Sequence, residues 1–188
     1  MTWLYDAHIH LSDIEYEHDI PLILNSMRKL RIKACCVSMD YTSSTKTLEL
    51  GKQSDFILPF IGIHPEKAQD GVESTFKLID ENNETISGIG EIGLDTTYTN
   101  SDEEFQKQEE VFKTQLSYAE KFGKPVSIHS RKTLDQILEI LPSYKVPSVL
   151  LHWFDGSKKQ LQQAMDLDCY VSFGPVMVYS KDKQILLS

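Results

Sequence analysis

Short apolar segments alternate with amphipathic segments along the whole chain. The apolar segments are nearly continuous in apolar and β-branched residues, which is typical of parallel strands covered on both faces. Seven segments of this kind are predicted to be strands: Trp3–His8, Ile32–Ser38, Phe56–Ile61, Ile86–Ile92, Pro125–His129, Pro147–His152 and Cys169–Phe173.

The segments between these strands carry helix signals. Residues 101–104 read Ser-Asp-Glu-Glu, a capping-box pattern, and the apolar spacing that follows predicts a helix ending at Gly123. A second capping pattern starts at Ser157, and the segments Pro21–Leu30 and Thr133–Leu141 are amphipathic at helical spacing. Strands that alternate with helices predict βαβ units and a parallel sheet.

Polar residues recur where one predicted strand after another ends. Barrel active sites are assembled in this way from many strand ends, whereas a doubly wound sheet concentrates its chemistry at one switch point, often with a glycine-rich first turn. No such turn follows the first predicted strand. The pattern therefore favours an α/β fold of the TIM-type (β/α)8 barrel kind.

The chain is short for a complete barrel. Such a barrel typically needs about 250 residues, whereas this chain has 188 and ends after a seventh predicted strand and the start of a helix at 180–188. We expect an incomplete barrel with strand eight missing, in a single domain over residues 1–188 that lacks the last β/α unit. An N-terminal portion of a longer protein is the preferred explanation. Open edges on the first and seventh strands would invite self-association.

Composition narrows the function classes. The chain has 19 basic and 28 acidic residues, a net charge of -9, which argues against a sequence-blind duplex clamp built on many phosphate contacts. An enzyme that neutralises phosphate with a bound metal ion is compatible with this charge. The three cysteines lack metal-site spacing and predict reduced thiols. With no apolar run of about 18 residues and no signal-peptide pattern, a cytoplasmic protein is predicted.

The first candidate site is the His-x-His pair formed by His8 and His10. Side chains at i and i+2 of a strand point to one face, roughly 6.5–7 Å apart, so two imidazoles so placed can bind one metal ion. The alternative is a pair of barrel-lining histidines held by hydrogen bonds. Glu91 lies in an apolar, glycine-rich strand, where an unpartnered carboxylate would be costly to bury. A structural ion pair is the alternative there.

Further polar residues lie at the same predicted rim. His129 and His152 each end a strand, and singly each would more often be a core residue than a ligand. Four strand-end histidines and one glutamate together favour a metal site. Weaker candidates for hydrogen-bond partners of a ligating histidine are Asp95 and Asp155. His18 lies in an acidic loop and is expected to be solvated.

Five ordered stretches give the chain a resemblance to a known family. They are Asp-Ala-His-Ile-His-Leu (6–11), Gly-Ile-His-Pro-Glu (62–66), Gly-Glu-Ile-Gly-Leu-Asp (90–95), His-Ser-Arg (129–131) and Leu-His-Trp-Phe-Asp-Gly-Ser (151–157). The chain resembles the TatD family of metal-dependent hydrolases, which includes deoxyribonucleases and belongs to the wider amidohydrolase superfamily. The five stretches run in the family's order and at about its spacing over essentially the whole chain.

This resemblance implies a two-metal centre that hydrolyses phosphodiester bonds in DNA or another phosphoester. His8 and His10 would hold one ion and His129 and His152 the second, with Glu91 bridging them as the central catalytic ligand. The family is usually described as working with Mg or Mn, whereas the ligand types also suit Zn or Ni.

Two residues are expected to contact the substrate. The resemblance gives His64 this role, with a loop histidine satisfied by the backbone as the alternative. Arg131 leaves its strand near the same rim, where a guanidinium can grip a phosphate with two hydrogen bonds. A surface arginine at a helix start is the alternative.

The chain departs from the family at one ligand, an aspartate at the end of strand eight in a Thr-Asp-x-Pro-type segment. Because the sequence ends at Ser188, we expect weaker metal binding at the His8/His10 site and impaired catalysis.

Two other functions remain open. One is an amidohydrolase-type enzyme acting on a small amide, ester or lactone. The other is a catalytically inactive remnant that serves as a scaffold. Arg131 and His64 favour a phosphate substrate over a neutral amide, and the missing strand eight is the main argument for the remnant.

Overall fold

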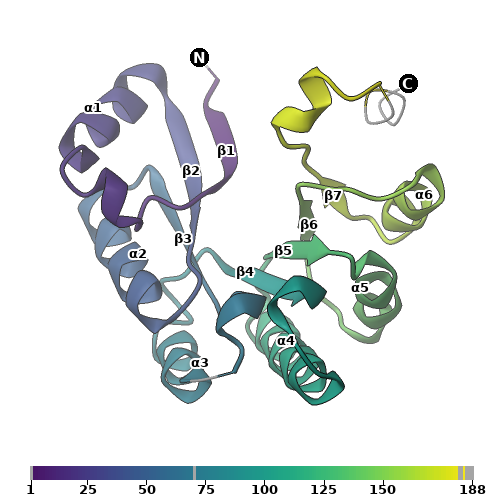
Figure 1. Ribbon diagram of the computed structural model, residues 1–188. Coiled ribbons are helices and arrows are strands. Elements are labelled where there is room, and N and C mark those ends of the chain that lie inside the picture. The colour runs from purple at the N-terminus through teal and green to yellow at the C-terminus, as the bar shows by residue number, and fades with distance from the viewer. Residues whose placement is uncertain (1, 70, 182–183, 185–188) are drawn as a thin grey trace.

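The computed structural model describes residues 2–69, 71–181 and 184 (Figure 1). Its strands form one parallel sheet, with each strand hydrogen-bonded to the next along the chain. The strands are β1 (Leu4–Ile9), β2 (Ile32–Val37), β3 (Ile57–Ile61), β4 (Gly88–Asp95), β5 (Val126–Arg131), β6 (Val149–His152) and β7 (Tyr170–Val171). All seven predicted strands are confirmed.

The sheet curls into part of a barrel, and the helices lie outside the curve (Figure 1). These helices are α1 (Ile20–Leu30), α2 (Tyr41–Gln53), α3 (Val72–Glu81), α4 (Asp102–Phe122), α5 (Leu134–Ile140) and α6 (Lys158–Asp166). The strand–helix alternation and the sequential strand order confirm the predicted incomplete TIM-type barrel. In the described part of the chain the sheet ends at β7.

The ends of the two helices predicted from capping patterns follow from local hydrogen bonds. At α6 the capping box is complete, because Ser157 and Gln160 each bond the other's backbone N–H. At α4 the Ser101 hydroxyl accepts from the Glu104 N–H at 3.2 Å, but the Glu104 carboxylate accepts from the Asn100 N–H instead. Gly123 ends α4 in the left-handed conformation, with φ +61°, as expected of a C-terminal glycine.

Burial falls from the centre of the sheet to its edges. All eight positions of β4 are buried, and the main core gathers around β3 to β6 beneath α4 and α5. At the edges, Leu4 and Tyr5 of β1 and Tyr170 of β7 are each more than 60% exposed. A charged group on β4 therefore lies in the best-shielded part of the molecule.

One glycine lets β4 and β5 approach closely. Gly93 has φ +146°, and a Cβ there would overlap the carbonyl oxygen of His129, its partner in register on β5. Any larger side chain at this position would therefore push His129 out of place.

The remaining sequence predictions concern the C-terminal helix, membrane spans and the cysteines. Residues 182–183 and 185–188 of the predicted terminal helix lie outside the described residues. None of the described helices has the length and apolar character that a bilayer span requires. Cys35, Cys36 and Cys169 are free thiols, and burial raises the pKa of Cys36 to about 12.

Candidate metal centre

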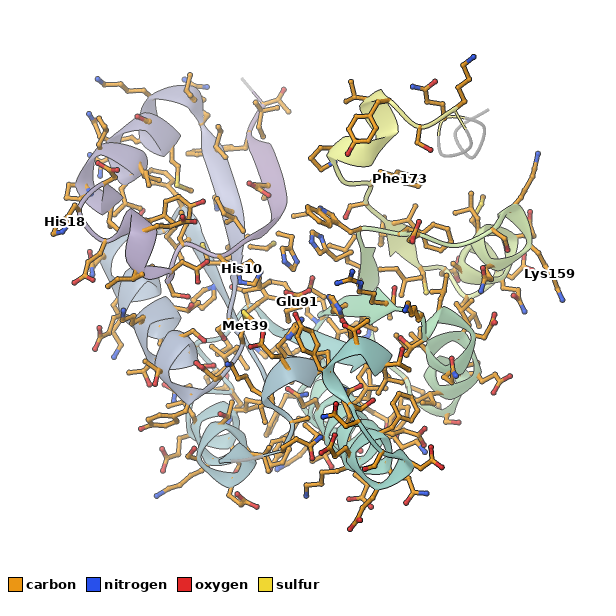
Figure 2. All side chains as sticks on the ribbon, viewed as in Figure 1. His10, His18, Met39, Glu91, Lys159 and Phe173 are labelled. Atoms are coloured by element: carbon orange, nitrogen blue, oxygen red, sulfur yellow. The ribbon has the colours of Figure 1, made fainter. Side chains whose placement is uncertain are left out.

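The predicted histidines and Glu91 converge inside the curve of the sheet. His8 lies in β1 with His10 directly after it, Glu91 lies in β4, and His129 and His152 lie in β5 and β6. Figure 2 shows His10 and Glu91 near each other at the centre, whereas His18 lies on the outside of the molecule. His18 is exposed, so its predicted solvation agrees with its position.

Glu91 uses both carboxylate oxygens within this cluster. Its Oε2 lies 3.1 Å from His10 Nε2 and 3.4 Å from His8 Nε2. Its Oε1 lies 3.2 Å from His129 Nδ1. The Glu91 side chain is only 5% exposed. A carboxylate with one oxygen toward His8 and His10 and the other toward His129 has the shape required of a ligand that bridges two cations.

The His8/His10 half of the cluster fits a metal ion. His8 Nε2 and His10 Nε2 are 3.2 Å apart, and one ligand atom from each of His8, His10 and Glu91 lies within 4.8 Å of the others. Nitrogens bound tetrahedrally at about 2.1 Å from one ion would lie about 3.4 Å apart. The two nitrogens therefore have nearly the spacing that a shared cation imposes.

A second group of possible ligand atoms comprises His64, Glu91 and His129, again within 4.8 Å of one another. His64 is 4% exposed and its ring lies 4.5 Å from that of His129. However, His64 Nδ1 accepts a hydrogen bond from the Glu66 N–H at 3.2 Å, which puts the proton of the neutral ring on Nε2. His64 is thus better suited to donate a hydrogen bond than to ligate.

His152 is the register partner of His129 on the neighbouring strand β6. Its ring stacks on His8, with centroids 3.4 Å apart and planes 5° apart, and its Nδ1 lies 3.3 Å from the Ser172 hydroxyl. Neither candidate ligand group in the described residues includes His152. Its predicted role as a ligand of the second ion stays a prediction.

Arg131 and Asp155 lie at the periphery. Arg131 ends β5, where it pairs in register with Asp95 and is exposed. Asp155 is exposed in the loop after β6. The proposed phosphate contact of Arg131 and the supporting role of Asp155 both stay predictions.

Hydrogen bonds outside the cluster set the orientation of two of its rings. The buried carboxylate of Asp95 lies 2.8 Å from His129 Nε2, which leaves His129 Nδ1 to face Glu91. The Ser127 hydroxyl lies 2.9 Å from His8 Nδ1 and leaves His8 Nε2 to face the same carboxylate. Outer partners of this kind fix the tautomer and angle of a metal-binding histidine.

Asp95 was expected to support a histidine, whereas Ser127 was missed by the sequence reading. Ser127 precedes His129 by two positions, so both side chains project from the same face of β5. That spacing is the signal that would have identified Ser127.

Two buried glutamines of α4 hold the backbone beside the cluster and were also missed. The Gln115 side chain accepts from the Ile63 N–H at 2.7 Å and donates to the Ile63 carbonyl at 3.0 Å. Gln108 accepts from the Asp95 N–H and donates to the carbonyls of Asp95 and Pro65. These bonds tie the segments that carry His64 and Asp95 to one helix.

The charge states of the clustered histidines and of Glu91 follow from their burial and from the interaction of the histidines with the Glu91 carboxylate. Burial would raise the pKa of Glu91, but hydrogen bonds from His10, His129 and His8 outweigh it and hold that pKa well below its usual range. Burial would lower the pKa of His10 and His129, but the hydrogen bond of each ring to Glu91 outweighs burial and raises the pKa of both. Burial lowers the pKa of His64 to about 4.

His152 has a different balance. Burial, followed by the charge of the adjacent His8, lowers the pKa of His152 to about 3. His64 and His152 are therefore neutral at neutral pH, with a lone pair on one ring nitrogen. Glu91 is the anion that stabilises the protonated rings of His10 and His129.

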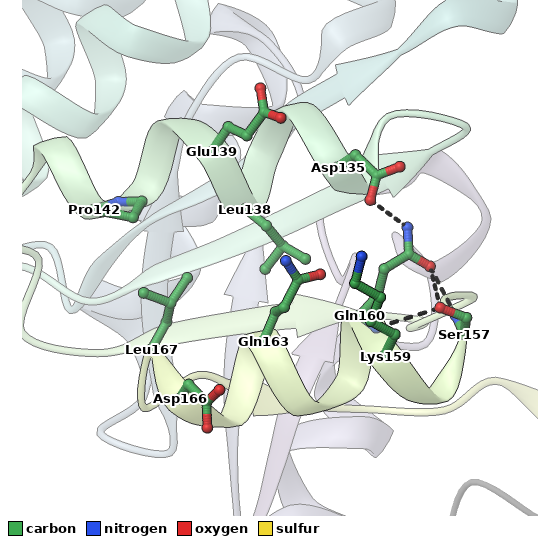
Figure 3. Close-up of a pocket in the computed structure, with 10 residues that line it drawn as sticks. All are labelled: Asp135, Leu138, Glu139, Pro142, Ser157, Lys159, Gln160, Gln163, Asp166 and Leu167. Atoms are coloured by element: carbon green, nitrogen blue, oxygen red, sulfur yellow. Dashed lines mark hydrogen bonds between the residues drawn. The ribbon is translucent and has the colours of Figure 1, made fainter.

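A separate groove lies between α5 and α6 (Figure 3). It is lined by Asp135, Leu138, Glu139, Pro142, Ser157, Lys159, Gln160, Gln163, Asp166 and Leu167. The Gln160 amide bridges its two helices by donating to Asp135 at 2.7 Å. None of the clustered histidines lines this groove, so it is separate from the candidate metal centre.

Comparison with known proteins identifies the family. The family model described as TatD related DNase matches residues 5–187. The chain belongs to this family. The resemblance noted in the five sequence stretches is thereby confirmed, as is the prediction of a metal-dependent hydrolase.

Several relatives share the TatD-type sequence over nearly the whole chain. The uncharacterized metal-dependent hydrolase YabD of Bacillus subtilis is 30% identical over 186 residues, which cover 96% of this chain and 72% of the relative. The deoxyribonuclease TATDN3 of Homo sapiens is 26% identical over 198 residues, covering 98% and 72% of the two chains.

A solved structure supports the fold. The TatD homologue YJJV of Escherichia coli superposes with a TM-score of 0.83 at 22% identity, over 94% of this chain and 70% of that one. At this identity the likeness establishes the TatD-type fold.

Proposed function

We propose that this chain hydrolyses phosphodiester bonds of DNA, with two divalent metal ions held by His8, His10, Glu91, His129 and His152. The observation that carries the proposal is the position of Glu91, whose Oε2 faces His8 and His10 while its Oε1 faces His129. Membership of the TatD family supports it, as do the relatives named deoxyribonucleases.

In this proposal, different residues of the chain hold the metal ions, orient a metal ligand and bind the phosphate. When bound, two such ions activate a water molecule and neutralise charge on the phosphate. Glu91 and the histidines would hold them, and Asp95 would keep His129 Nδ1 free to bind. His64, with its proton on Nε2, would donate a hydrogen bond to a phosphate oxygen. Arg131 would bind the phosphate from the rim.

The identity of the ion follows from the donor set. Histidine nitrogens around one carboxylate suit Mn, Zn or Ni better than Mg, which prefers oxygen ligands. The family description favours Mg or Mn. Mn satisfies both considerations, and we propose it as the ion to test first.

The proposal is tested by nucleotide release from labelled single-stranded DNA with Mn or Mg. Glu91→Gln keeps the size of the side chain but removes the charge that faces His8, His10 and His129, so release should fall at least about 100-fold. Glu103→Gln, on the exposed start of α4, is the matched control and should retain activity.

Three outcomes would contradict the proposal. Equal release by the wild-type and Glu91→Gln proteins would assign the nuclease activity elsewhere. Hydrolysis of a small ester or amide without DNA cleavage would favour the amidohydrolase alternative. A folded, metal-loaded wild-type protein that cleaves neither substrate would favour the scaffold alternative.

We also infer that residues 1–188 form one hydrolase domain. Support comes from the single sheet, which takes a strand from every part of the described chain. The cytoplasmic location predicted from the sequence stays a prediction.

A further inference from the structure

Two exposed aromatic side chains lie directly beside the metal cluster. Trp153 follows His152 at the end of β6 and is 59% exposed. Tyr98 ends the short 3-10 helix η3 (Thr96–Tyr98) after β4 and is 41% exposed. Single exposed aromatics are common on protein surfaces, so exposure alone does not indicate a binding role for Trp153 and Tyr98. Their position and contacts are what indicate one.

Each aromatic ring contacts a histidine of the cluster. The Trp153 ring is stacked with His152, with centroids 5.5 Å apart and planes 26° apart. The Tyr98 ring meets His64 edge-on at 5.8 Å. Because His152 stacks on His8 and His64 contacts His129, the two aromatics occupy opposite ends of a series of contacts that passes through Glu91.

The backbone holds Trp153 in an unfavourable conformation with its ring exposed. Its φ is +47°, in the left-handed region that costs a non-glycine residue roughly 1–2 kcal/mol. Its N–H donates to Ser172 Oγ at 3.2 Å, and the same hydroxyl bonds His152. Gly174 lies close to the ring, since a Cβ there would be 3.0 Å from two ring atoms.

This conformation brings little burial in return. A tryptophan buried in a core would recover the backbone cost through packing, but this ring stays mostly in solvent. Strained residues that the surroundings hold in place are concentrated at ligand-binding sites. The strained backbone and exposed ring of Trp153 are therefore explained if a planar group of a bound ligand stacks on the ring.

A nucleobase is the flat partner that fits this position. In a phosphodiester substrate the bases lie next to the phosphate that the metal centre would bind. Stacking of a base on an aromatic side chain contributes about 1–3 kcal/mol and tolerates any sequence. The net charge of -9 leaves little general attraction for a polyanion, so stacking would supply affinity that charge does not.

We propose that Trp153 and Tyr98 form a base-stacking subsite that flanks the metal centre, with Trp153 as its main platform. The inference rests on the proposed DNA hydrolysis and adds to it the residues that bind the bases beside the scissile phosphate. Both aromatics act on substrate binding, and neither takes part in bond cleavage.

The kinetic test compares Trp153→Ala and Trp153→Phe on single-stranded DNA with Mn. Loss of one stacking contact should raise KM roughly 5- to 150-fold while kcat stays within about 2-fold, and phenylalanine should restore most of the affinity. On an oligonucleotide that lacks the bases next to the cleaved bond, wild type and Trp153→Ala should have similar KM values. Tyr98→Ala should show a smaller effect of the same kind.

A binding test separates this inference from the proposed activity. The chain has two tryptophans, so the Trp3→Phe protein reports fluorescence from Trp153 alone. A single-stranded oligonucleotide should quench that emission, and an abasic oligonucleotide should not. Quenching without any DNA cleavage would uphold the subsite and contradict the proposed function. Cleavage with no quenching and no change of KM in Trp153→Ala would overturn the subsite alone.

Discussion

At the scale of single residues, the cluster depends on hydrogen bonds that free the correct nitrogen of each histidine. Asp95 and Ser127 occupy the far nitrogens of His129 and His8. The remaining nitrogens then face Glu91. The same side chains would be poor ligands if their rings were free to rotate.

Replacing Asp95 by asparagine tests this arrangement. The amide keeps the shape of the side chain but can turn its NH2 group toward His129 Nε2, which disfavours the tautomer that exposes Nδ1. We expect Mn affinity to fall roughly 10- to 100-fold, measured by isothermal titration calorimetry. Asp135→Asn, on the surface of α5, is the control and should leave affinity unchanged. Equal affinities in both variants would contradict the assignment.

The raised pKa values of His10 and His129 predict a pH dependence. A raised pKa means that each ring keeps its proton at a higher pH, so protons compete with a cation as the pH falls. Mn affinity should therefore decrease from about pH 8 to about pH 6, with protons released on binding near neutrality. Calorimetry in two buffers of different ionisation enthalpy measures that release. Binding without it would be inconsistent with these histidines as ligands.

At the scale of elements, the site is formed where β4 and β5 approach closely. Gly93 permits that approach next to His129, and α4 fixes the neighbouring loops through Gln108 and Gln115. The helix thus positions the metal cluster without contributing a ligand to it.

Gly93→Ala should destabilise the protein and displace His129. Both Gly93 and Gly123 have positive φ values, but a Cβ at Gly123 would meet open space. Gly123→Ala should therefore cost only the backbone strain, about 1 kcal/mol, while Gly93→Ala should cost roughly 1–3 kcal/mol more because of the overlap. Urea denaturation of the two variants measures the difference. Equal losses of stability would show that the overlap is relieved without cost.

The sequence was sufficient for the strands, because buried parallel strands leave near-continuous apolar segments. It was less informative for α2 and α3, which the pattern did not single out. Helix α2 has many polar residues and begins with an Asp40–Ser43 capping pair instead of the usual serine–glutamate pattern. The end of β4 was also placed too early, at Ile92 instead of Asp95, since the last residues mix polar and apolar side chains.

For the site, residue type and strand position predicted which side chains would converge, but not how they would share partners. His152 lies beside His129 as its register partner on the neighbouring strand, but the stacking of its ring on His8 was not foreseen. The roles of Ser127, Gln108 and Gln115 depend on contacts between segments far apart in the chain. Such contacts leave no local pattern for a single sequence to reveal.

At the scale of the whole molecule, the part-barrel exposes both sheet edges. In the described residues β1 pairs only with β2, and β7 only with β6. Tyr5 and Tyr170 on these strands are 64% and 67% exposed. Unpaired edges with apolar side chains tend to pair with other chains.

The chain should therefore self-associate as its concentration rises. The double variant Tyr5→Lys/Tyr170→Lys should shift it toward the monomer, because charge on an edge strand opposes pairing. Tyr41→Lys, at an exposed position on α2, is the matched control. Light scattering coupled to size-exclusion chromatography measures the mass. A monomer at all concentrations, or an equal effect of the control, would contradict this prediction.

The most direct test of the proposed metal centre is the number of Mn ions that each chain binds, with and without the Glu91 carboxylate. Equilibrium dialysis with metal analysis should give two ions per wild-type chain. In a folded Glu91→Gln protein both should weaken together, because one carboxylate faces His8 and His10 with one oxygen and His129 with the other. Two ions bound with unchanged affinity in that variant would contradict the bridging role of Glu91 and the metal centre built on it.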